Sequence, residues 1–529
     1  MIMERKLDSS DNEEHTLRIA EILGDLRFRG IRVWSEDGHL RYRAPKGTLE
    51  DAEIEILRES KEQIVALLER STPSPLTSER PADAFLRAYR APLSFSQLWH
   101  WNLHQLEKRR SSRHVVSATR LLGPLNVELL RRSSIEIVRR HDALRTRIVV
   151  VDGTPMQEID ESVNFELKVD DLTALQNAAR ESEVRRLIDH EILEPIDLAI
   201  GPLFAFRLLK LRDDDCVLIV TMDHLITDGY SINILLRDLF AAYMQGLKGR
   251  AFSLPEIAVQ LGEYASWQRN TLKSWMQKHG AYWDERLRGY RPVRAPVDGR
   301  TDTQTSLGWG SVPVQIGTEL KAELQEWCRL HRTTLAMGVF TAYVGLISRW
   351  CNASDIVIQQ QINNRASPKV ENTIGYFTSV LFLRFEIPDD ERFVDLMNRV
   401  TDEYCKAHEH ADFNYLAAQI PRPDFARSNW FNWIPMEPKL DPLDVSDSEG
   451  AIEVCPFHFA NPAVKTFDWD NDPEFVLFET HDDVVGTLYF PLNRFSIDSM
   501  ERLTRNLLTF IRELLRQPEQ RVKDVALLG

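Results

Sequence analysis

The residues best suited to chemistry lie in one short segment, Asp223-His-Leu-Ile-Thr-Asp-Gly229. An imidazole, whose unperturbed pKa is about 6.5, can accept a proton from an amine or hydroxyl near neutral pH, or hydrogen-bond to a tetrahedral intermediate. His224 therefore suits an acyl transfer in which such a nucleophile attacks a thioester. A single histidine in so short a pattern is more often a loop residue without chemistry, so its surroundings must decide between the two interpretations.

Two regular elements are predicted on either side of this segment. The apolar run Cys216–Met222 predicts a buried strand, and the apolar residues after Ser231 recur on one helical face. We predict Ser231 as the N-cap of that helix. Gly229 permits a close turn or a positive φ at the helix entrance, and Asp228, if buried, requires a cationic partner. A loop between two rigid elements is a common place for a reactive side chain.

The chain around this loop predicts a mixed α/β fold. Strand-like runs at Leu203–Lys210, Asp355–Ile362 and Val380–Phe385 alternate with amphipathic helices from about residue 88 onward. The apolar segment Leu335–Ile347 is too short to span a bilayer and predicts a buried helix. The 529 residues exceed one typical core, so we expect two large lobes and a smaller unit.

The first 70 residues predict that smaller unit. Helical spacing, a two-strand hairpin around Asp37-Gly38 and a second helix follow one another at residues 17–26, 31–42 and about 49–68. Residues 71–87 are rich in Pro, Ser and Thr and predict a linker. The unit is therefore expected to be tethered to the main body.

Composition excludes several classes of function. The net charge of −15, from 80 acidic and 65 basic residues, opposes a general attraction to nucleic acid or to anionic membranes. The five cysteines are far apart and form no Cys-x-x-Cys pair, which argues against structural zinc and a disulfide framework. Residues 1–15 lack the apolar core of a signal peptide. We expect a cytoplasmic monomer without a metal.

Several motifs give the chain a resemblance to a known family. The segment Asp223–Gly229 resembles the His-His-x-x-x-Asp-Gly signature of the condensation domains of nonribosomal peptide synthetases. Four other motifs of that family occur in the family's order, and Phe431-Asn-Trp433 resembles a late one. The four are Ser94-Phe-Ser-Gln97 with Trp101, Arg140-His-Asp-Ala-Leu-Arg-Thr146, Glu263-Tyr-Ala-Ser-Trp-Gln268 and Ile374-Gly-Tyr-Phe377. The resemblance covers residues 88–529.

The resemblance implies a particular architecture. Two chloramphenicol acetyltransferase-like lobes, here 88–269 and 270–529, would form a V behind a helix-hairpin-helix docking domain at 1–70 and the linker 71–87. A tunnel between the lobes would admit two phosphopantetheine arms, which meet at the histidine. No cofactor would be bound, because the substrates arrive on the phosphopantetheine of carrier proteins.

The same resemblance assigns roles to individual residues. His224 would be the catalytic histidine, while Asp228 and Gly229 would shape its loop. Arg145 is our preferred partner for Asp228; the other interpretation is that it is a surface arginine on the helix predicted from Val127 to His141. Arg294 and Arg300 are the alternatives.

Two positions depart from the family pattern. Asp223 replaces the first histidine of the signature, a position that usually points away from the reaction, so we expect activity to survive. Ser379 stands where the family has an asparagine, so the role of that amide does not carry over. Ser379 and Tyr376 are our candidates for lining the tunnel.

The N-terminal unit resembles the β-hairpin docking domains of such synthetases, through Leu40-Arg-Tyr-Arg-Ala-Pro-Lys-Gly47. These domains pair a strand edge with a motif at the C-terminus of an upstream carrier protein. An acidic motif is the expected ligand, because the hairpin region carries Trp34 together with the cations Arg32, Arg41, Arg43 and Lys46. The alternative is that these cations form an ordinary solvated face.

The sequence shows no adenylation or carrier domain and stops where a condensation domain would end. We therefore expect a free-standing condensation enzyme that moves an acyl group from a carrier-bound thioester to an amine or hydroxyl. The acceptor would be carrier-bound or a free small molecule. Alternatives are an epimerisation domain, a degenerate domain that only recruits partners, and a coenzyme A-dependent acetyltransferase.

Overall fold

The structure is a computed structural model that describes most of the main body and part of the N-terminal unit. In the body it covers residues 89–106, 114–298, 308–411, 429–434, 452–457 and 472–527, apart from 163 and 366. In the N-terminal unit it covers 32–36, 39–43 and single positions between 54 and 65. The helix predicted over 17–26 and the linker predicted over 71–87 lie outside the described residues.

The first lobe is built on a five-stranded sheet in the order β14-β4-β9-β8-β7. Its strands are β4 (His114–Leu122), β7 (Lys168–Asp171), β8 (Phe204–Arg212), β9 (Asp215–Asp223) and β14 (Glu453–Pro456). Its helices are α5 (Val127–Arg140), α6 (Asn177–Leu193) and α7 (Gly229–Leu247). Val217 and Ile219 of β9 pack with α6, whereas Leu218 and Val220 pack with α5 and α7. Burial on both faces explains the unbroken apolar run of this strand.

The second lobe is built on a six-stranded sheet in the order β10-β16-β15-β13-β11-β12. Its strands are β10 (Trp309–Gln315), β11 (Asp355–Ile362), β12 (Ser379–Glu386), β13 (Trp430–Ile434), β15 (Glu474–Glu479) and β16 (Val484–Pro491). Helices α10 (Thr318–Leu330), α11 (Leu335–Cys351), α12 (Phe393–His408) and α14 (Ile497–Arg516) pack beside it. The four strands and the buried helix predicted from the sequence are thereby confirmed.

Helix α11 lies in the core of this lobe, with residues 335–347 buried. Within the described part of the chain, no single helix is long and apolar enough to cross a membrane. The pair α10 and α11, bent by 102°, meets that criterion by length and composition only.

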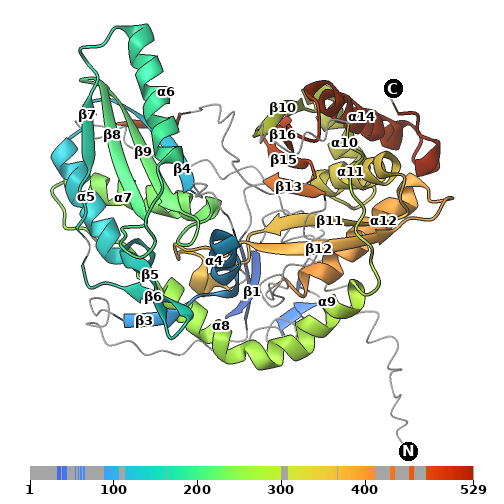
Figure 1. The fold of residues 1–529 in the computed structure, drawn as a ribbon, viewed down its shortest axis with the longest axis horizontal. Helices are drawn as coiled ribbons and strands as arrows, with labels where there is room; N and C mark the ends of the chain where they lie inside the picture. Colours follow the sequence, from blue (N-terminus) through green and yellow to red (C-terminus); the bar gives the residue numbers. More distant parts are fainter. Residues whose placement is uncertain are drawn as a thin grey trace, which may run out of the picture.

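Four strands of each sheet follow the same plan. In the first lobe β9 lies between β4 and β8, antiparallel to both, and β7 runs parallel to β8. In the second lobe β16 lies between β10 and β15, antiparallel to both, and β13 runs parallel to β15. The strands β9 and β16 lead into helices α7 and α14. Figure 1 shows the two lobes as the arms of a V, in agreement with the predicted fold class.

Several elements connect the lobes. Helix α8 (Leu261–Trp275) and, after the π-helix Met276–Gly280, helix α9 (Ala281–Arg286) run beneath both (Figure 1). The lobe boundary predicted at 269/270 therefore falls inside α8. Strand β14 comes from the second half of the chain but pairs with β4 in the first sheet. Smaller elements are α4 (Phe95–Leu106), the sheet β3 (Tyr89–Pro92), β6 (Thr154–Ile159) and β5 (Thr146–Val151), and short 3-10 helices at Asp142–Arg145, Pro368–Val370 and Val522–Asp524.

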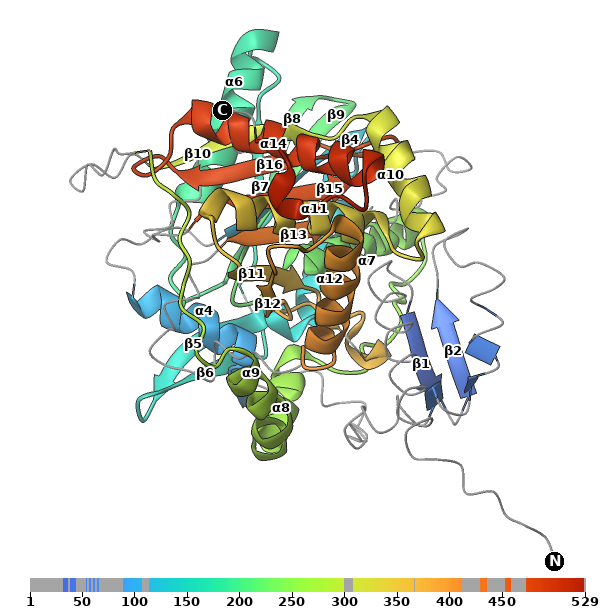
Figure 2. The same cartoon turned by 90° about the vertical axis from the view of Figure 1, so that its right-hand side faces the viewer.

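The N-terminal hairpin is confirmed. Strands β1 (Arg32–Glu36) and β2 (His39–Arg43) pair antiparallel, from Arg32 opposite Arg43 to Glu36 opposite His39. The described positions 54, 57, 58, 61, 64 and 65 are helical, as the predicted helix over 49–68 requires. Figure 2 shows the hairpin beside the body of the protein.

Candidate active site

His224 lies where β9 ends and before α7 begins. The next three residues, Leu225, Ile226 and Thr227, are fully buried and anchor the loop, while His224 itself is partly exposed. His224 Nδ1 lies 3.3 Å from the carbonyl oxygen of Thr227. When Nδ1 carries the proton and donates to this oxygen, Nε2 is the nitrogen able to accept a proton. The loop thus presents a partly exposed imidazole on a buried base.

Asp228 is joined to Arg365, a residue of the second lobe. Arg365 Nη1 donates to Asp228 Oδ2 over 2.7 Å, and Nη2 donates to Oδ1 over 3.0 Å. The amides of Ser231 and Phe377 also donate to this carboxylate, over 2.9 and 3.1 Å. Both partners are buried, so the pair is a bidentate ion pair in the interior with its remaining lone pairs satisfied.

The surroundings of Asp228 keep it ionised. Burial alone raises the pKa of this carboxyl, but the charge of Arg365 and the hydrogen bonds from Arg365, Phe377 and Ser231 outweigh burial and hold the pKa below its usual value. Ser231 Oγ extends the network, because it lies 2.9 Å from the carbonyl oxygen and 3.0 Å from the amide nitrogen of Gly375. The histidine loop is therefore fastened to the second lobe.

Two of the three predicted partners of Asp228 were wrong. Arg145 is buried, but its Nη2 donates to Asp142 over 2.6 Å within its own 3-10 helix. Arg294 pairs with Asp472 at 3.3 Å. Arg300 lies outside the described residues. Arg145 is thus anchored within the first lobe, and the cation that pairs with Asp228 is Arg365.

One prediction about the start of α7 was also wrong. The N-cap is Asp228, not Ser231, because the Asp228 side chain accepts the hydrogen bond of the Ser231 amide and Gly229 is already helical. Gly229 does not have a positive φ, and a Cβ placed there would meet nothing within 4 Å. Glycine is therefore not required at this position by the backbone of the described residues.

Asp223, the last residue of β9, is buried. Its Oδ1 accepts the amide hydrogen of Leu225 over 2.8 Å, and its Oδ2 lies 3.9 Å from His104 Nε2 of α4. The carboxylate that replaces the first histidine of the signature therefore faces another imidazole. This contact supports the expectation that position 223 serves the loop rather than the reacting atoms.

Helix α4 also supplies His100, whose ring stacks on that of His224 with centroids 5.1 Å apart and an interplanar angle of 20°. Tyr376 lies edge-on to both rings, with centroids 4.4 Å from His100 and 5.7 Å from His224. Tyr376, predicted as a tunnel residue, is therefore adjacent to the candidate catalytic histidine.

Ser379, the other predicted tunnel residue, is the first residue of β12 and is buried. Its Oγ has no hydrogen-bond partner among the described residues. The assignment of Ser379 as a tunnel residue stays a prediction.

The sequence motifs hold the histidine loop in place. Gln97 donates from Nε2 to the carbonyl oxygen of Leu225 over 2.8 Å, and Gln268 accepts the amide hydrogen of Phe95 over 2.8 Å. His141 Nε2 lies 3.1 Å from Asp238 of α7. Burial alone raises the pKa of Asp238, but the hydrogen bond from His141 and the charge of Arg237 bring that pKa down to about 2. These motifs are thus structural supports of the site.

Sequence reasoning missed Arg365 and His100. Arg365 follows the end of the predicted strand 355–362 by three residues, which places it in a loop at a strand end, but no local signal joins it to Asp228. His100 had a usable signal: Gln97, His100 and His104 are spaced as neighbours on one helical face. The contact of Gln97 with the loop means that this face points at residues 223–225.

The docking residues are only partly described. Arg41 is exposed on β2, beside Tyr42, whose exposed fraction is 48%. Arg32, Trp34 and Arg43 lie on the two strands, but their side chains are outside the described residues, as is Lys46. Their predicted contact with an acidic motif stays a prediction.

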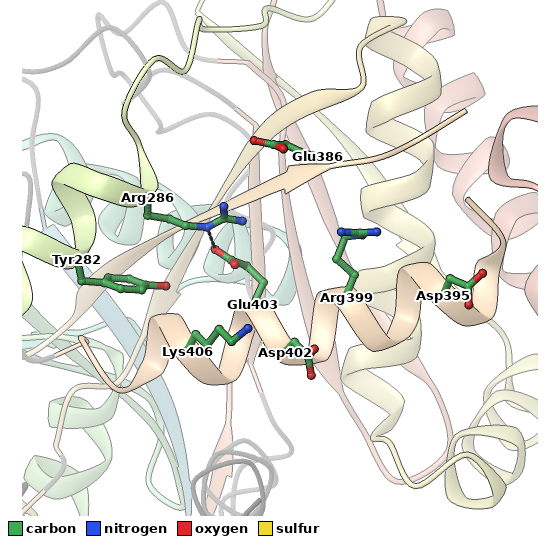
Figure 3. A pocket seen from close by; sticks show the side chains of 8 residues that line it. All are labelled: Tyr282, Arg286, Glu386, Asp395, Arg399, Asp402, Glu403 and Lys406. Carbon is green, nitrogen blue, oxygen red and sulfur yellow. Dashed lines mark hydrogen bonds and ion pairs between the residues drawn. The ribbon is translucent and has the colours of Figure 1, made fainter. Parts of the chain in front are cut away.

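A separate cavity of about 550 Å³ lies in the second lobe (Figure 3). Opposite charges in it neutralise one another, as in the 2.6 Å ion pair between Arg286 and Glu403, and Arg399 pairs with Glu391 outside it. None of the residues around His224 lines it; the lining is Tyr282, Arg286, Glu386, Asp395, Arg399, Asp402, Glu403 and Lys406. No cluster of metal-ligating side chains occurs in the described ranges.

Comparison with known proteins agrees with this fold and site. The chain belongs to the condensation domain family, which matches residues 88–529, and the TubC N-terminal docking domain matches residues 19–70. Its relatives include a linear gramicidin synthase of Brevibacillus parabrevis, 30% identical over 449 residues, and the malpibaldin synthetase of Mortierella alpina, 30% identical over 454 residues. Both alignments cover 83% of this chain, but only 9% and 8% of the relatives. The chain thus spans under a tenth of the length of either relative.

Solved structures share the fold. The X-domain from teicoplanin biosynthesis has a TM-score of 0.71 at 23% identity, covering 86% of this chain and 100% of that one. The EpoB cyclization-docking bidomain from Sorangium cellulosum has a TM-score of 0.68 at 19% identity, covering 96% of this chain and 99% of that one. The likeness to the bidomain extends over more of the chain than the condensation region alone.

Proposed function

We propose that this protein transfers an acyl group from the phosphopantetheine thioester of a carrier protein to an amine or hydroxyl, with His224 at the reacting centre. The observation that carries the proposal is the placement of His224. Its imidazole is partly exposed on a buried loop, and the adjacent Asp228 is fixed to Arg365 of the opposite lobe. A site built across two lobes can receive two substrates from different sides.

The chemistry requires one proton acceptor. The nucleophile attacks the thioester carbonyl and forms a C–N or C–O bond while His224 Nε2 takes its proton. The C–S bond then breaks, and the proton passes to the departing thiolate, so the imidazole returns to its starting state. The contact of Nδ1 with the Thr227 carbonyl favours the tautomer that leaves Nε2 basic. Neither a metal nor a bound cofactor is needed for these steps.

We further propose that the donor is delivered by an upstream carrier protein that binds β1 and β2 through an acidic C-terminal motif. The match to the docking domain family and the exposed Arg41 and Tyr42 on β2 support this partner. The acceptor is a second carrier protein or a free small molecule.

Intact-protein mass spectrometry tests the transfer. Carrier proteins loaded with a panel of acyl groups are incubated with the protein and with candidate amines and alcohols, and loss of the acyl mass is followed together with the product. The wild type is expected to unload at least one carrier, and His224→Ala is expected to stop this while keeping its fold. Equal unloading by both proteins would refute the role of His224, and no unloading of any carrier would favour a domain that only recruits partners.

A further inference from the structure

We propose that His100 is a positioning residue for His224 and holds its imidazole in the orientation and tautomer that transfer requires. The kinetic part of this inference rests on the proposed function. The structural part concerns the resting protein alone. Position 100 lies between Gln97 and Trp101 of the first sequence motif but is not one of the residues by which that motif was recognised.

The hydrogen bond from His224 Nδ1 is too long to fix the ring alone. The Nδ1 to oxygen distance of 3.3 Å exceeds the usual range of about 2.7–3.2 Å. The ring is also packed by two others, with His100 stacked on it and Tyr376 edge-on. Offset-stacked and edge-on arrangements are the favourable geometries for planar rings at these separations. Removing His100 therefore uncovers one face of the His224 ring.

Both supporting rings are held firmly. Helix α4 is fixed to the histidine loop by the hydrogen bond from Gln97 to the Leu225 carbonyl oxygen. The start of α4 is fixed to α8 by the hydrogen bond from the Phe95 amide to Gln268. Tyr376 lies between two residues whose amides are engaged by the Asp228 network. His100 can therefore act as a fixed support for the His224 ring.

Positioning matters because proton transfer depends on geometry. A displacement of about 1 Å in a catalytic group can cost roughly 100-fold in rate. Rotation of His224 about its side-chain bonds, or exchange of its two tautomers, would take the basic nitrogen away from the nucleophile. The ring stack limits this rotation. Because the expected effect is on the proton acceptor, turnover should fall much more than substrate affinity.

The kinetic experiment compares three variants in the carrier-unloading assay. His100→Ala is expected to lower kcat roughly 10- to 100-fold with KM within about twofold of the wild type. His100→Phe keeps a stacked ring without its nitrogens and is expected to return kcat to within about threefold of the wild type. Gln105→Ala, an exposed position on the same helix, is the matched control. If His100→Ala does not fold, His100→Leu replaces it, because it keeps volume without a planar ring.

A second measurement needs no activity. In protein labelled with 15N-histidine, the ring signals of His224 are identified by their loss in His224→Ala. In the wild type and in His100→Phe, the His224 ring is expected to show a single tautomer, protonated at Nδ1. In His100→Ala, its 15N chemical shifts are expected to approach the average of the two tautomers. This measurement separates the positioning role of His100 from the proposed acyl transfer, because it can be interpreted even if no acyl transfer is found.

Two results would overturn the inference. His100→Ala with wild-type turnover and unchanged ring shifts would show that the stack does not position His224. His100→Phe as inactive as His100→Ala, with the His224 tautomer preserved, would show that a nitrogen of His100 itself is required. Restored turnover in His100→Phe together with a restored tautomer would support positioning.

Discussion

The two lobes carry the same strand–loop–helix unit, but of the two described loops only that of the first lobe holds a histidine. In the first lobe, the hairpin β8-β9 leads through residues 224–228 into α7, and in the second, β15-β16 leads through 492–496 into α14. Both helices begin with a side-chain cap, Asp228 on the amide of Ser231 and Ser496 on the amide of Ser499. The backbone plan is shared, so the difference lies in the loop side chains.

The buried ion pairs show that difference most clearly. Asp228 reaches across to Arg365 of the other lobe, whereas Arg494 in the second loop pairs with Asp472 of its own lobe at 2.9 Å. The pKa values diverge accordingly. Hydrogen bonds and charge lower the pKa of Asp228 in spite of burial, whereas burial dominates at Asp472 and raises its pKa. A repeated scaffold thus supports an interface charge in one copy and an internal charge in the other.

The largest expected effect compares one residue from each of the two loops. His224→Ala should lower acyl transfer by about 10²- to 10⁴-fold, the usual contribution of a general base. Asn493→Ala, an exposed residue in the second loop, should leave the rate unchanged. Rates come from carrier unloading by mass spectrometry, with circular dichroism to confirm folding. Similar losses in both variants would mean that the loops are functionally equivalent.

The next effect concerns stability. Asp228→Asn leaves Arg365 buried without its carboxylate and should lower the free energy of unfolding by about 3–5 kcal/mol. Asp472→Asn should cost less, about 1–3 kcal/mol, the usual cost of leaving a buried group such as Arg494 without its partner, because burial already opposes the ionised form of Asp472 and raises its pKa. Urea unfolding of both variants measures the difference. A larger cost at Asp472 would contradict the pKa assignments.

The two carboxylates should also respond oppositely to acid. The lowered pKa of Asp228 contributes stability above the unfolded value of about 3.9, and this is lost as pH falls through the folded pKa. Because the pKa of Asp472 is raised in the folded protein, its ionised form lowers the free energy of unfolding. This loss of stability disappears as pH falls through the folded pKa toward the unfolded value. Acidification should therefore reduce the difference in the free energy of unfolding between the wild type and Asp228→Asn.

The same acidification should improve the stability of the wild type relative to Asp472→Asn. Unfolding curves of the three proteins at about pH 6 and at about pH 3, which lies below the unfolded pKa of an aspartate, provide the comparison. If both differences in the free energy of unfolding changed in the same direction, the two carboxylates would not have oppositely shifted pKa values.

The smallest effect is expected at Gly229. Its φ is ordinary and a Cβ would meet open space, so Gly229→Ala should change the free energy of unfolding by no more than about 1 kcal/mol. A thermal melt measures this. Loss of carrier unloading in a normally stable variant would show that substrate passes over this position, whereas strong destabilisation would contradict the described backbone.

The sequence predicted well those elements that depend on residues close together in the chain. The strand ending at Asp223, the apolar helix beginning at Leu335 and the hairpin of β1 and β2 depend on neighbours in sequence, and all were found as predicted. The N-cap of α7 was misplaced by three residues because Asp228 and Ser231 are both good capping residues. The capping hydrogen bond runs between the two, and only its direction distinguishes them.

Long-range choices were beyond the sequence. Asp228 and Arg365 are separated by 137 residues, and several other arginines satisfied the same electrostatic requirement. The pairing of β14 with β4 had no local signal, since a short strand is compatible with either sheet. The stacking of His100 on His224 combined both kinds of information, because helical spacing gave the face and the tertiary structure gave its neighbour.

Strand β14 has a mechanical consequence. Its four residues come from the second half of the chain and pair antiparallel with β4, from Glu453 opposite Leu122 to Pro456 opposite Thr119. Separation of the lobes would have to break this ladder in addition to the buried ion pair between Asp228 and Arg365. The lobe that holds the histidine loop is thus joined to the second half of the chain by main-chain hydrogen bonds as well as by charge.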